Sequence, residues 1–344
     1  MASNMLSVVD FLQKSTTTPV IDVRSPGEYA HAHLPGAINV SLFSNDERAQ
    51  VGTCYKQIGR DAAVLLGLEL VGPKLANFVK TARAIAPAGI ILIHCWRGGM
   101  RSGSMAWLLE TAGFQTHTLV GGYKAYRNHV LAAFEQPHQL RILGGKTGSG
   151  KTDILRELSV LGQQVLDLED LANHKGSSYG AIGQLAQPSS EQFENIIYQH
   201  WQHLDPTRPI WVEDESRSIG TCTISQAIWT QMRAAPVAFI DLPKHVRVAR
   251  LVKEYACFDH ELLLQATNRI KNRLGGQHYQ AAIEALENRD YAQVADLTLT
   301  YYDKAYLHGL SKRNDQTIHN LQIEEDNPTQ TAQKLIAWLH ETSL

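Results

Sequence analysis

Residues 140–152 read LRILGGKTGSGKT, an apolar stretch that runs directly into a glycine-rich loop. The spacing fits GxxxxGKT, a loop whose backbone N–H groups wrap a phosphate. The apolar residues predict a strand and residues 153–161 predict a helix, which is the context that this motif requires. The stretch therefore predicts an α/β domain with a site for phosphate or diphosphate, built from Gly145, Lys146, Thr147, Gly148, Ser149, Gly150, Lys151 and Thr152.

Two residue types extend this prediction beyond the loop. In such loops the lysine, here Lys151, reaches a terminal phosphate oxygen, and the hydroxyl of Thr152 can hold Mg²⁺. An acid at the end of a neighbouring strand would complete the site, and Asp214 is the first candidate, with Asp167 behind it. Helix capping or a solvated loop end is an equally good role for either acid.

Strand-like runs on both sides of the loop indicate two domains. A chain of 344 residues is too long for one ordinary core. PVIDV (19–23) and GIILIHC (89–95) suit buried strands of a parallel sheet, and QVLDL (164–168), PIWVED (209–214) and PVAFIDL (236–242) repeat the pattern later. The polar segment EQPHQ (135–139) separates the two series. We predict α/β domains over residues 1–136 and 137–344, the second with a mainly helical part from about Lys244.

A cysteine follows one of these strands directly. HCWRGGMRS (94–102) leads from the strand into a helix, so its N–H groups and the helix dipole predict an anion cradle. A thiol in that field ionises more easily, which makes Cys95 a candidate nucleophile, and Arg101 a candidate partner for an oxyanion. The cradle would comprise Trp96, Arg97, Gly98, Gly99 and Met100. A lone cysteine at a strand end is otherwise most often a core residue.

Composition limits the remaining choices. The net charge is −2, so nucleic acid could bind only through a local basic patch. The span 244–273 contains the candidates for contacts to tRNA or to phosphate, namely Lys244, Arg247, Arg250, Arg269, Lys271 and Arg273. A solvated helix face explains that span equally well. Four cysteines without a CxxC pair argue against structural zinc and disulfides. Without a signal peptide or a long uncharged apolar run, we expect a cytoplasmic protein with no membrane partner.

The first domain resembles rhodanese domains. DVRSPGEY (22–29), HLPGAINV (33–40) and the Cys95 loop correspond, in order, to the signature blocks of that family. One feature departs from the pattern: five residues separate Cys95 from Arg101, whereas sulfurtransferase loops commonly have four. Five is the spacing of cysteine phosphatases, so phosphatase chemistry stays open for this domain.

A rhodanese-like domain followed by a phosphate-loop domain resembles the tRNA 2-selenouridine synthase family. The similarity runs over nearly the whole chain and includes DLEDLANHKGS (167–177), QPSSEQFE (187–194) and VEDESRSIG (212–220). It implies exchange of sulfur for selenium at the wobble 2-thiouridine of tRNA, with selenophosphate as donor. It also implies geranyl diphosphate as a second co-substrate, which gives an S-geranyl intermediate.

The resemblance further implies a division of labour between the two sites. Cys95 would carry selenium as a perselenide, with Arg101 and the loop amides on the phosphate portion, while Lys151 and Thr152 would hold the diphosphate. Mg²⁺ would assist, no tightly bound cofactor is implied, and the partners are the tRNA and an enzyme that supplies selenophosphate. Two alternatives remain: a P-loop phosphotransferase with a regulatory rhodanese module, and a non-catalytic module that binds tRNA and phosphate.

Overall fold

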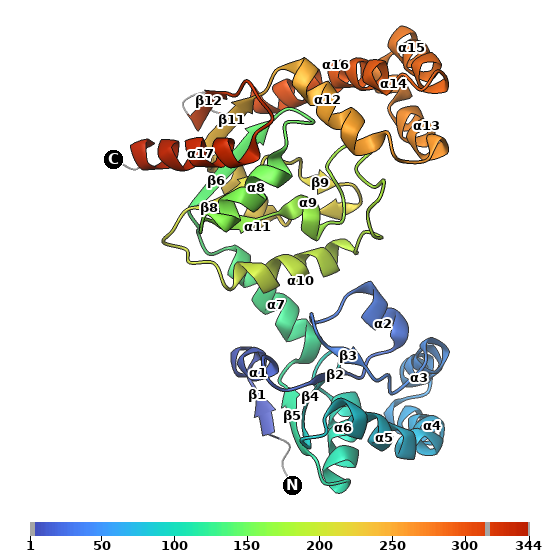
Figure 1. The fold of residues 1–344 in the computed structure, drawn as a ribbon. Helices are drawn as coiled ribbons and strands as arrows, with labels where there is room; N and C mark the ends of the chain where they lie inside the picture. The colour runs from blue at the N-terminus through green and yellow to red at the C-terminus, as the bar shows by residue number, and fades with distance from the viewer. Residues whose placement is uncertain (1–3, 314–316, 343–344) are drawn as a thin grey trace. The chain divides into compact units, whose positions relative to one another are not determined.

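A computed structural model describes residues 4–313 and 317–342. The chain divides into two compact units, Met1–Ala133 and Phe134–Leu344, close to the boundary expected at residue 136 (Figure 1). Each unit has its own sheet, and each is described by itself.

The first unit is built on a parallel sheet of five strands. The strand order is β1-β5-β4-β2-β3, so β4, the strand that leads to Cys95, is central. The strands are β1 (Asn4–Leu6), β2 (Val20–Asp22), β3 (Ile38–Asn39), β4 (Ile90–His94) and β5 (Gln115–Leu119). The helices are α1 (Val8–Ser15), α2 (Pro26–His31), α3 (Asn45–Gln57), α4 (Arg60–Val71), α5 (Leu75–Ile85), α6 (Met100–Thr111) and α7 (Gly122–Phe134), with a short 3₁₀ turn η1 (Gly72–Lys74).

Capping residues in the local sequence fix where two helices of this unit begin. Ser25 and Glu28 form a capping box at α2, and Ser44 and Glu47 form another at α3, each satisfying two N–H groups that the helix itself leaves unpaired. The core lies between the sheet and the helices on it, and residues such as Ile91, Ile93 and Phe78 are buried there. The carboxyl ends of the parallel strands therefore share one edge of the sheet, where Cys95 lies.

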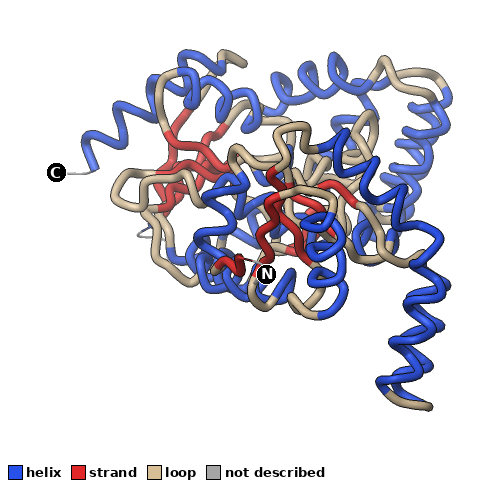
Figure 2. Tube along the Cα trace, turned by 90° about the horizontal axis from the view of Figure 1, so that it is seen from below, coloured by secondary structure: helices blue, strands red, loops and turns tan. Residues whose placement is uncertain are grey.

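The second unit repeats the plan with a longer helical part. Its parallel sheet has the order β12-β11-β6-β8-β7, with β6 (Leu140–Gly145) central, beside β7 (Gln164–Leu166), β8 (Ile210–Glu213), β11 (Val237–Asp241) and β12 (Ile318–Gln322). A separate antiparallel pair joins β9 (Ser218–Ile219) to β10 (Cys222–Thr223). The helices are α8 (Lys151–Val160), α9 (Leu168–Leu171), α10 (Ser190–Trp201), α11 (Gln226–Ala234), α12 (Lys244–Tyr255), α13 (His260–Arg269), α14 (Lys271–Leu274), α15 (Gly276–Glu287), α16 (Tyr291–Leu310) and α17 (Pro328–Thr342). Figure 2 shows strands gathered inside and helices outside.

The predicted α/β class, with two parallel sheets and a helical region after Lys244, is confirmed. The strand β12 was missed, because IHNLQ is only partly buried and pairs with β11 from 81 positions away in sequence, Val237 against Ile318. The edge strands β1 and β3 were also missed, since two or three residues carry no readable alternation.

One helical run is apolar enough to be mistaken for a membrane span. Residues 60–85, covering α4, η1 and α5, meet that test by length and composition alone. Phe78 and Ala82 of this run are buried in the core of the first unit, which accounts for part of its apolar character. The cytoplasmic location remains a prediction.

Candidate active site

The Cys95 thiol is buried at the end of β4 and surrounded by hydrogen-bond donors. Its side chain is 3% exposed, and Sγ lies 3.2 Å from the hydroxyl oxygen of Ser102 in the first turns of α6. Burial by itself would raise the pKa of the thiol. Hydrogen bonds from the Ser102 side chain and from the N–H groups of Ser102, Arg97 and Gly99 outweigh this and lower the Cys95 pKa below its usual value. A lowered pKa favours the thiolate, which is the form that nucleophilic chemistry requires.

A second loop closes against the Cys95 loop. Gly98 has a φ of +66°, and a Cβ on it would lie 2.5 Å from the carbonyl oxygen of Leu119, so only glycine fits. The N–H of Tyr123, at the start of α7, donates to the carbonyl of Cys95 at 2.8 Å. Gly99 has a φ of −104° and is the N-cap of α6. The loop shape thus depends on two segments, not on 94–102 alone.

The guanidinium of Arg101, predicted to bind an oxyanion, is already paired with a carboxylate of the protein. It pairs with Glu28 of α2 at 2.8 Å, and Glu28 also lies 3.5 Å from Arg48. Around it, Trp96 is half-buried, whereas Arg97 and Met100 are exposed at the rim. An anion in the cradle would therefore compete with Glu28 for Arg101, a feature that the loop sequence does not reveal.

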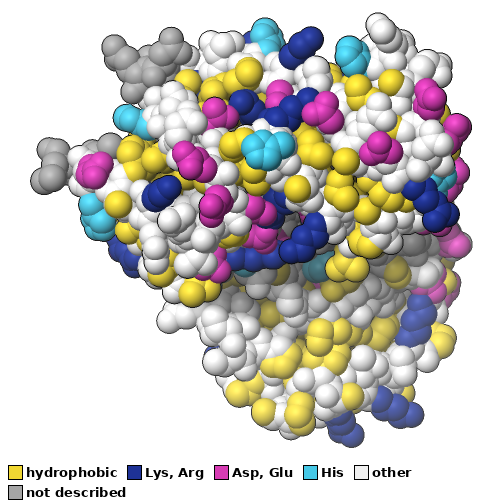
Figure 3. All heavy atoms as spheres, turned by 45° about the horizontal axis from the view of Figure 1, so that its top comes forward, with side chains coloured by type: hydrophobic (Ala, Val, Ile, Leu, Met, Phe, Trp, Pro, Cys, Tyr) yellow, Lys and Arg dark blue, Asp and Glu magenta, His cyan; other side chains and the backbone are white. Residues whose placement is uncertain are grey.

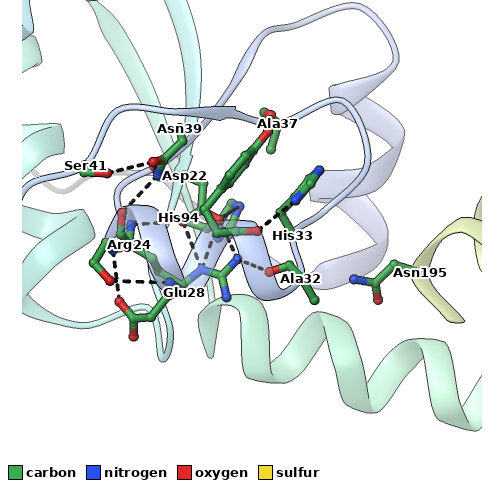
Figure 4. Close-up of polar contacts among 12 residues, drawn as sticks. Asp22, Arg24, Glu28, Ala32, His33, Ala37, Asn39, Ser41, His94 and Asn195 are labelled. Carbon is green, nitrogen blue, oxygen red and sulfur yellow. Dashed lines mark hydrogen bonds and ion pairs between the residues drawn. The ribbon is translucent and has the colours of Figure 1, made fainter. Parts of the chain in front are cut away.

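Behind the loop lies a buried charged network, drawn in Figure 4. Arg24 forms an ion pair of 2.6 Å with Asp22, with exposures of 1% and 0%, and donates to the carbonyl of Ala32 at 2.8 Å. The His94 ring lies 3.8 Å from Asp22, and burial lowers the pKa of His94, which keeps the ring neutral. Asp22 and Arg24 belong to the first rhodanese-like block, whereas His94 directly precedes Cys95.

The phosphate loop of the second unit has the expected geometry. β6 ends at Gly145, α8 begins at Lys151, and Gly148 and Gly150 both have a φ of +78°. Lys151 Nζ donates to the carbonyl of Gly145 at 3.3 Å, and the N–H of Gly145 donates to the Tyr306 hydroxyl at 2.9 Å. Within the loop, Lys146 forms an ion pair of 2.9 Å with Asp241. The carbonyl of Thr147 accepts a hydrogen bond from Arg247, and the side chain of Ser149 is buried.

Carboxylates crowd the ammonium group of Lys151. Burial would lower its pKa, but Glu215, Glu169, Asp214 and Glu213 raise it above the usual value, so the lysine stays charged. Burial together with the neighbouring acids raises the pKa values of Glu213 and Glu215 well above their ordinary range. A cation facing several acids in this way has a charge environment that a bound phosphate group and its counter-ions would complete.

The acid that the Thr152 hydroxyl contacts is Glu169, not Asp214 or Asp167. The Thr152 hydroxyl lies 3.3 Å from Glu169 Oε2, and hydroxyl and carboxylate oxygens are the donors that Mg²⁺ prefers. Asp214 instead pairs with Arg313 at 2.7 Å and accepts from Tyr306 at 2.8 Å. Asp167 caps α9, which was the alternative left open, and burial raises its pKa to about 6. Among residues 4–313 and 317–342, no group of three His, Cys, Asp or Glu side chains is arranged to hold a metal ion by itself.

We predict that replacing Glu213 with glutamine stabilises the protein at alkaline pH. Because the Glu213 pKa is raised on folding, its stabilising contribution is complete below about pH 4.5 and is lost as the pH rises toward the folded pKa. Glutamine cannot ionise, yet it keeps the acceptor for the Glu169 N–H at 2.6 Å. A tenfold change in proton affinity corresponds to about 1.4 kcal/mol, so a gain of that order is expected near pH 8.

Thermal unfolding followed by circular dichroism across pH measures this effect. The exposed Glu284 supplies the control, because Glu284→Gln removes a carboxylate of α15 without touching a buried group. Equal shifts for both variants at alkaline pH would contradict the prediction.

Most of the predicted basic contacts are engaged inside the protein. Arg247 is 2% exposed and pairs through two hydrogen bonds of 2.8 Å with Asp303, so it cannot contact tRNA as expected, because α16 covers it. Arg250 pairs with Asp153 and Asp326, and Lys244 with Asp296. Arg269, Lys271 and Arg273 are exposed at α13 and α14. On the face drawn in Figure 3, Lys and Arg side chains alternate with Asp and Glu and form no continuous basic field.

We predict that Arg247→Met destabilises the second unit by about 3 kcal/mol, the cost of leaving one partner of a buried pair alone. Its loss would leave Asp303 without its counter-charge and the Thr147 carbonyl without a donor. Urea denaturation of the full chain measures the change. Arg269→Met, at an exposed position, should stay within about 0.5 kcal/mol of the wild type; a similar small effect for Arg247→Met would show that its pair with Asp303 is dispensable.

Several residues of the two sites were not predicted. Tyr306 and Arg313 lie in no motif, Glu28 lies in the DVRSPGEY block without an assigned role, and all three act on partners more than 70 positions away. Ser102 belongs to the quoted loop segment, and its position one turn into the helix was the available signal. Glu169 lies in a segment that matched the family without an assigned role.

Comparison with known proteins agrees with the two-domain organisation. Residues 7–129 match the rhodanese-like domain, and residues 138–333 match the tRNA 2-selenouridine synthase AAA domain. A solved N-terminal domain from Clostridium difficile 630 is 41% identical, with a TM-score of 0.34, and covers 37% of this chain and 99% of that chain.

Curated relatives match over most of their length. A tRNA 2-selenouridine synthase from Serratia proteamaculans is 36% identical over 87% of this chain and 89% of its own. Those of Bordetella bronchiseptica and Bdellovibrio bacteriovorus are each 35% identical, over 84% and 86% of this chain and 87% and 90% of their own. With both domain models matched in order and relatives of this similarity along its length, the chain belongs to the tRNA 2-selenouridine synthase family.

Proposed function

We propose that this enzyme replaces the sulfur of wobble 2-thiouridine in tRNA by selenium, in two steps that use separate sites. The observation that carries the proposal is the Cys95 thiol, buried at 3% exposure yet with a pKa lowered by surrounding donors, in a chain of this family. Buried structural cysteines have the opposite character, as Cys222 illustrates, since burial raises its pKa to about 11.

In the first step, the thione sulfur attacks the first carbon of geranyl diphosphate. A carbon–sulfur bond forms, the carbon–oxygen bond breaks, its electron pair leaves with diphosphate, and the N3 proton of the base passes to solvent. The loop amides and Lys151 would bind the diphosphate and stabilise its charge as it leaves. Thr152 and Glu169 supply oxygen ligands suited to Mg²⁺, which would neutralise further negative charge on the diphosphate.

In the second step, selenium from selenophosphate displaces the alkylated sulfur. Overall, S-geranyl-2-thiouridine, selenophosphate and water give 2-selenouridine, geranyl thiol and phosphate, which balances without an external oxidant or reductant. Alkylation matters because a thione is a poor leaving group, whereas the alkylated sulfur departs as a thiol. The perselenide that the resemblance implies would need a two-electron oxidant, so Cys95 would act on the phosphorus instead: its thiolate takes the phosphoryl group, the phosphorus–selenium bond breaks, and the released selenide displaces the geranyl thiolate. Water then cleaves the sulfur–phosphorus bond, which gives phosphate and restores the thiolate. Arg101 would exchange Glu28 for the phosphate portion of the donor. A separate enzyme would supply selenophosphate.

The test is mass spectrometry of nucleosides from a tRNA that carries 2-thiouridine. The tRNA is incubated with the full chain and with geranyl diphosphate, selenophosphate, both, or neither. We expect S-geranyl-2-thiouridine with geranyl diphosphate alone and 2-selenouridine only when both are present. An unchanged nucleoside under all four conditions, together with ATP turnover or release of phosphate from esters, would overturn the proposal in favour of a phosphotransferase or a phosphatase.

A further inference from the structure

An apolar pocket opens beside the phosphate loop of the second unit. It contains about 530 Å³ of space not filled by protein atoms, part of it open to solvent. Its wall includes Thr147 of the loop, Leu251 and Tyr255 of α12, and Ala295, Leu299 and Tyr302 of α16. None of the described residues that line it is Asp, Glu, Lys, Arg or His.

The pocket is joined to the loop by direct contacts. Thr147 belongs to both, and a Cβ placed on Gly148 would lie 3.1 Å from Leu251 Cγ. Arg247, one turn before Leu251 on α12, donates to the Thr147 carbonyl at 3.1 Å and so ties this helix to the loop. A ligand whose phosphates lie on the loop amides therefore has this pocket as the neighbouring space for the rest of the molecule.

Three hydroxyl groups of the wall already have hydrogen-bond partners inside the protein. The Tyr302 hydroxyl accepts from the N–H of Ser178 at 3.0 Å, and the Thr298 hydroxyl donates to the carbonyl of Val294 at 2.9 Å. The Tyr179 hydroxyl lies 2.7 Å from that of Thr267. A nucleobase carries donors and acceptors that would lose water here without gaining partners, which is costly, whereas a hydrocarbon chain gains from the same surroundings.

We propose that this pocket binds the hydrocarbon chain of the prenyl diphosphate whose diphosphate group lies on the phosphate loop. The inference rests on the proposed function, which assigns that diphosphate to the loop. It adds a binding site for the hydrocarbon chain and a physical reason why the site would exclude nucleotides. Helices α12, α13, α15 and α16 supply the wall, so the helical part of the second unit acts as the chain-binding part.

Isothermal titration calorimetry of the full chain with geranyl diphosphate and with inorganic diphosphate tests the assignment. The wild-type protein should bind geranyl diphosphate roughly 100-fold more tightly than inorganic diphosphate, because burial of a few methylene groups suffices for that ratio of affinities. Ala295→Trp fills the pocket and should abolish the ratio while the affinity for inorganic diphosphate stays unchanged. The matched control is Ala292→Trp, which places the same side chain on the exposed side of α16 and should keep the ratio.

The outcomes separate the two proposals. If Ala295→Trp is folded and keeps the wild-type ratio, while Lys151→Ala loses both ligands, the pocket assignment is overturned and the diphosphate site survives. If wild type binds neither ligand, or if Lys151→Ala changes nothing, the diphosphate site fails and the pocket assignment fails with it.

A second measurement covers the case in which Ala295→Trp does not fold. Wild type is photolabelled with a diazirine analogue of geranyl diphosphate and digested, with unlabelled geranyl diphosphate as competitor. We expect the label on two segments, residues 251–256 at the end of α12 and residues 291–302 in α16. Unlabelled geranyl diphosphate should abolish this labelling. Competed label confined to other segments would refute the assignment.

Discussion

Replacing Cys95 with serine is expected to abolish selenium transfer to S-geranylated tRNA, by roughly 10³-fold or more, as removal of an essential nucleophile does. Serine keeps the size of the buried side chain and can still bond to Ser102, so the fold should survive. Its hydroxyl does not ionise near neutral pH and cannot replace the thiolate as the nucleophile. S-geranylation should continue, because no group of the first unit acts in that step.

The measurement is the yield of 2-selenouridine from a tRNA geranylated in advance, with selenophosphate as the only co-substrate. Cys257→Ser is the control, since Cys257 is an exposed thiol and its loss should leave both steps unchanged. Retention of selenium transfer in Cys95→Ser would remove this thiol from the reaction. A parallel loss of geranylation would instead indicate a damaged fold.

Replacing Lys151 with alanine is expected to produce the opposite pattern. S-geranylation should fall by roughly 10²–10³-fold, the usual cost of losing one group that stabilises charge in the transition state. Selenium transfer to a tRNA geranylated in advance should persist. The variant also leaves Glu169, Glu213, Asp214 and Glu215 without their shared cation, so its melting temperature has to be measured alongside activity.

Lys334→Ala, at an exposed lysine of α17, is the matched control and should retain both steps. Thr152→Ala gives an independent test of the same site if Lys151→Ala proves unstable, because it removes only the hydroxyl that faces Glu169. Undiminished geranylation in a folded Lys151→Ala variant would show that the phosphate loop does not hold the prenyl donor.

Several features could be read from the sequence because their chemistry is contiguous. The phosphate loop occupies residues 145–152, and the strand before it and helix after it are local neighbours, so spacing alone predicted the shape of the loop. The same holds for Cys95, whose loop lies between a buried strand and a helix. The central strands β4, β6, β8 and β11 were also predicted, because a strand covered on both faces is a continuous apolar run.

Other features depend on residues that only folding brings together. Arg101 looked free in its loop, but Glu28, 73 positions earlier, neutralises it. Arg247 looked like a solvated helix residue, but α16 buries it against Asp303. Asp214 looked like the acid of the phosphate site, but Arg313 and Tyr306 bind it and leave Glu169 beside Thr152. The sequence alone does not reveal whether a charged side chain faces water or an ion-pair partner.

The sequence by itself determined the two α/β domains, the GxxxxGKT loop between a strand and a helix, and the place of Cys95 at a strand end, because each follows from short-range pattern and backbone geometry. Only the tertiary structure decided which acids and arginines are available to a ligand, and that four helices enclose an apolar pocket beside Thr147. The apolar residues of those helices have the spacing of an ordinary core. Whether they fill the space between them is a matter of packing across distant segments, which periodicity along the chain does not encode.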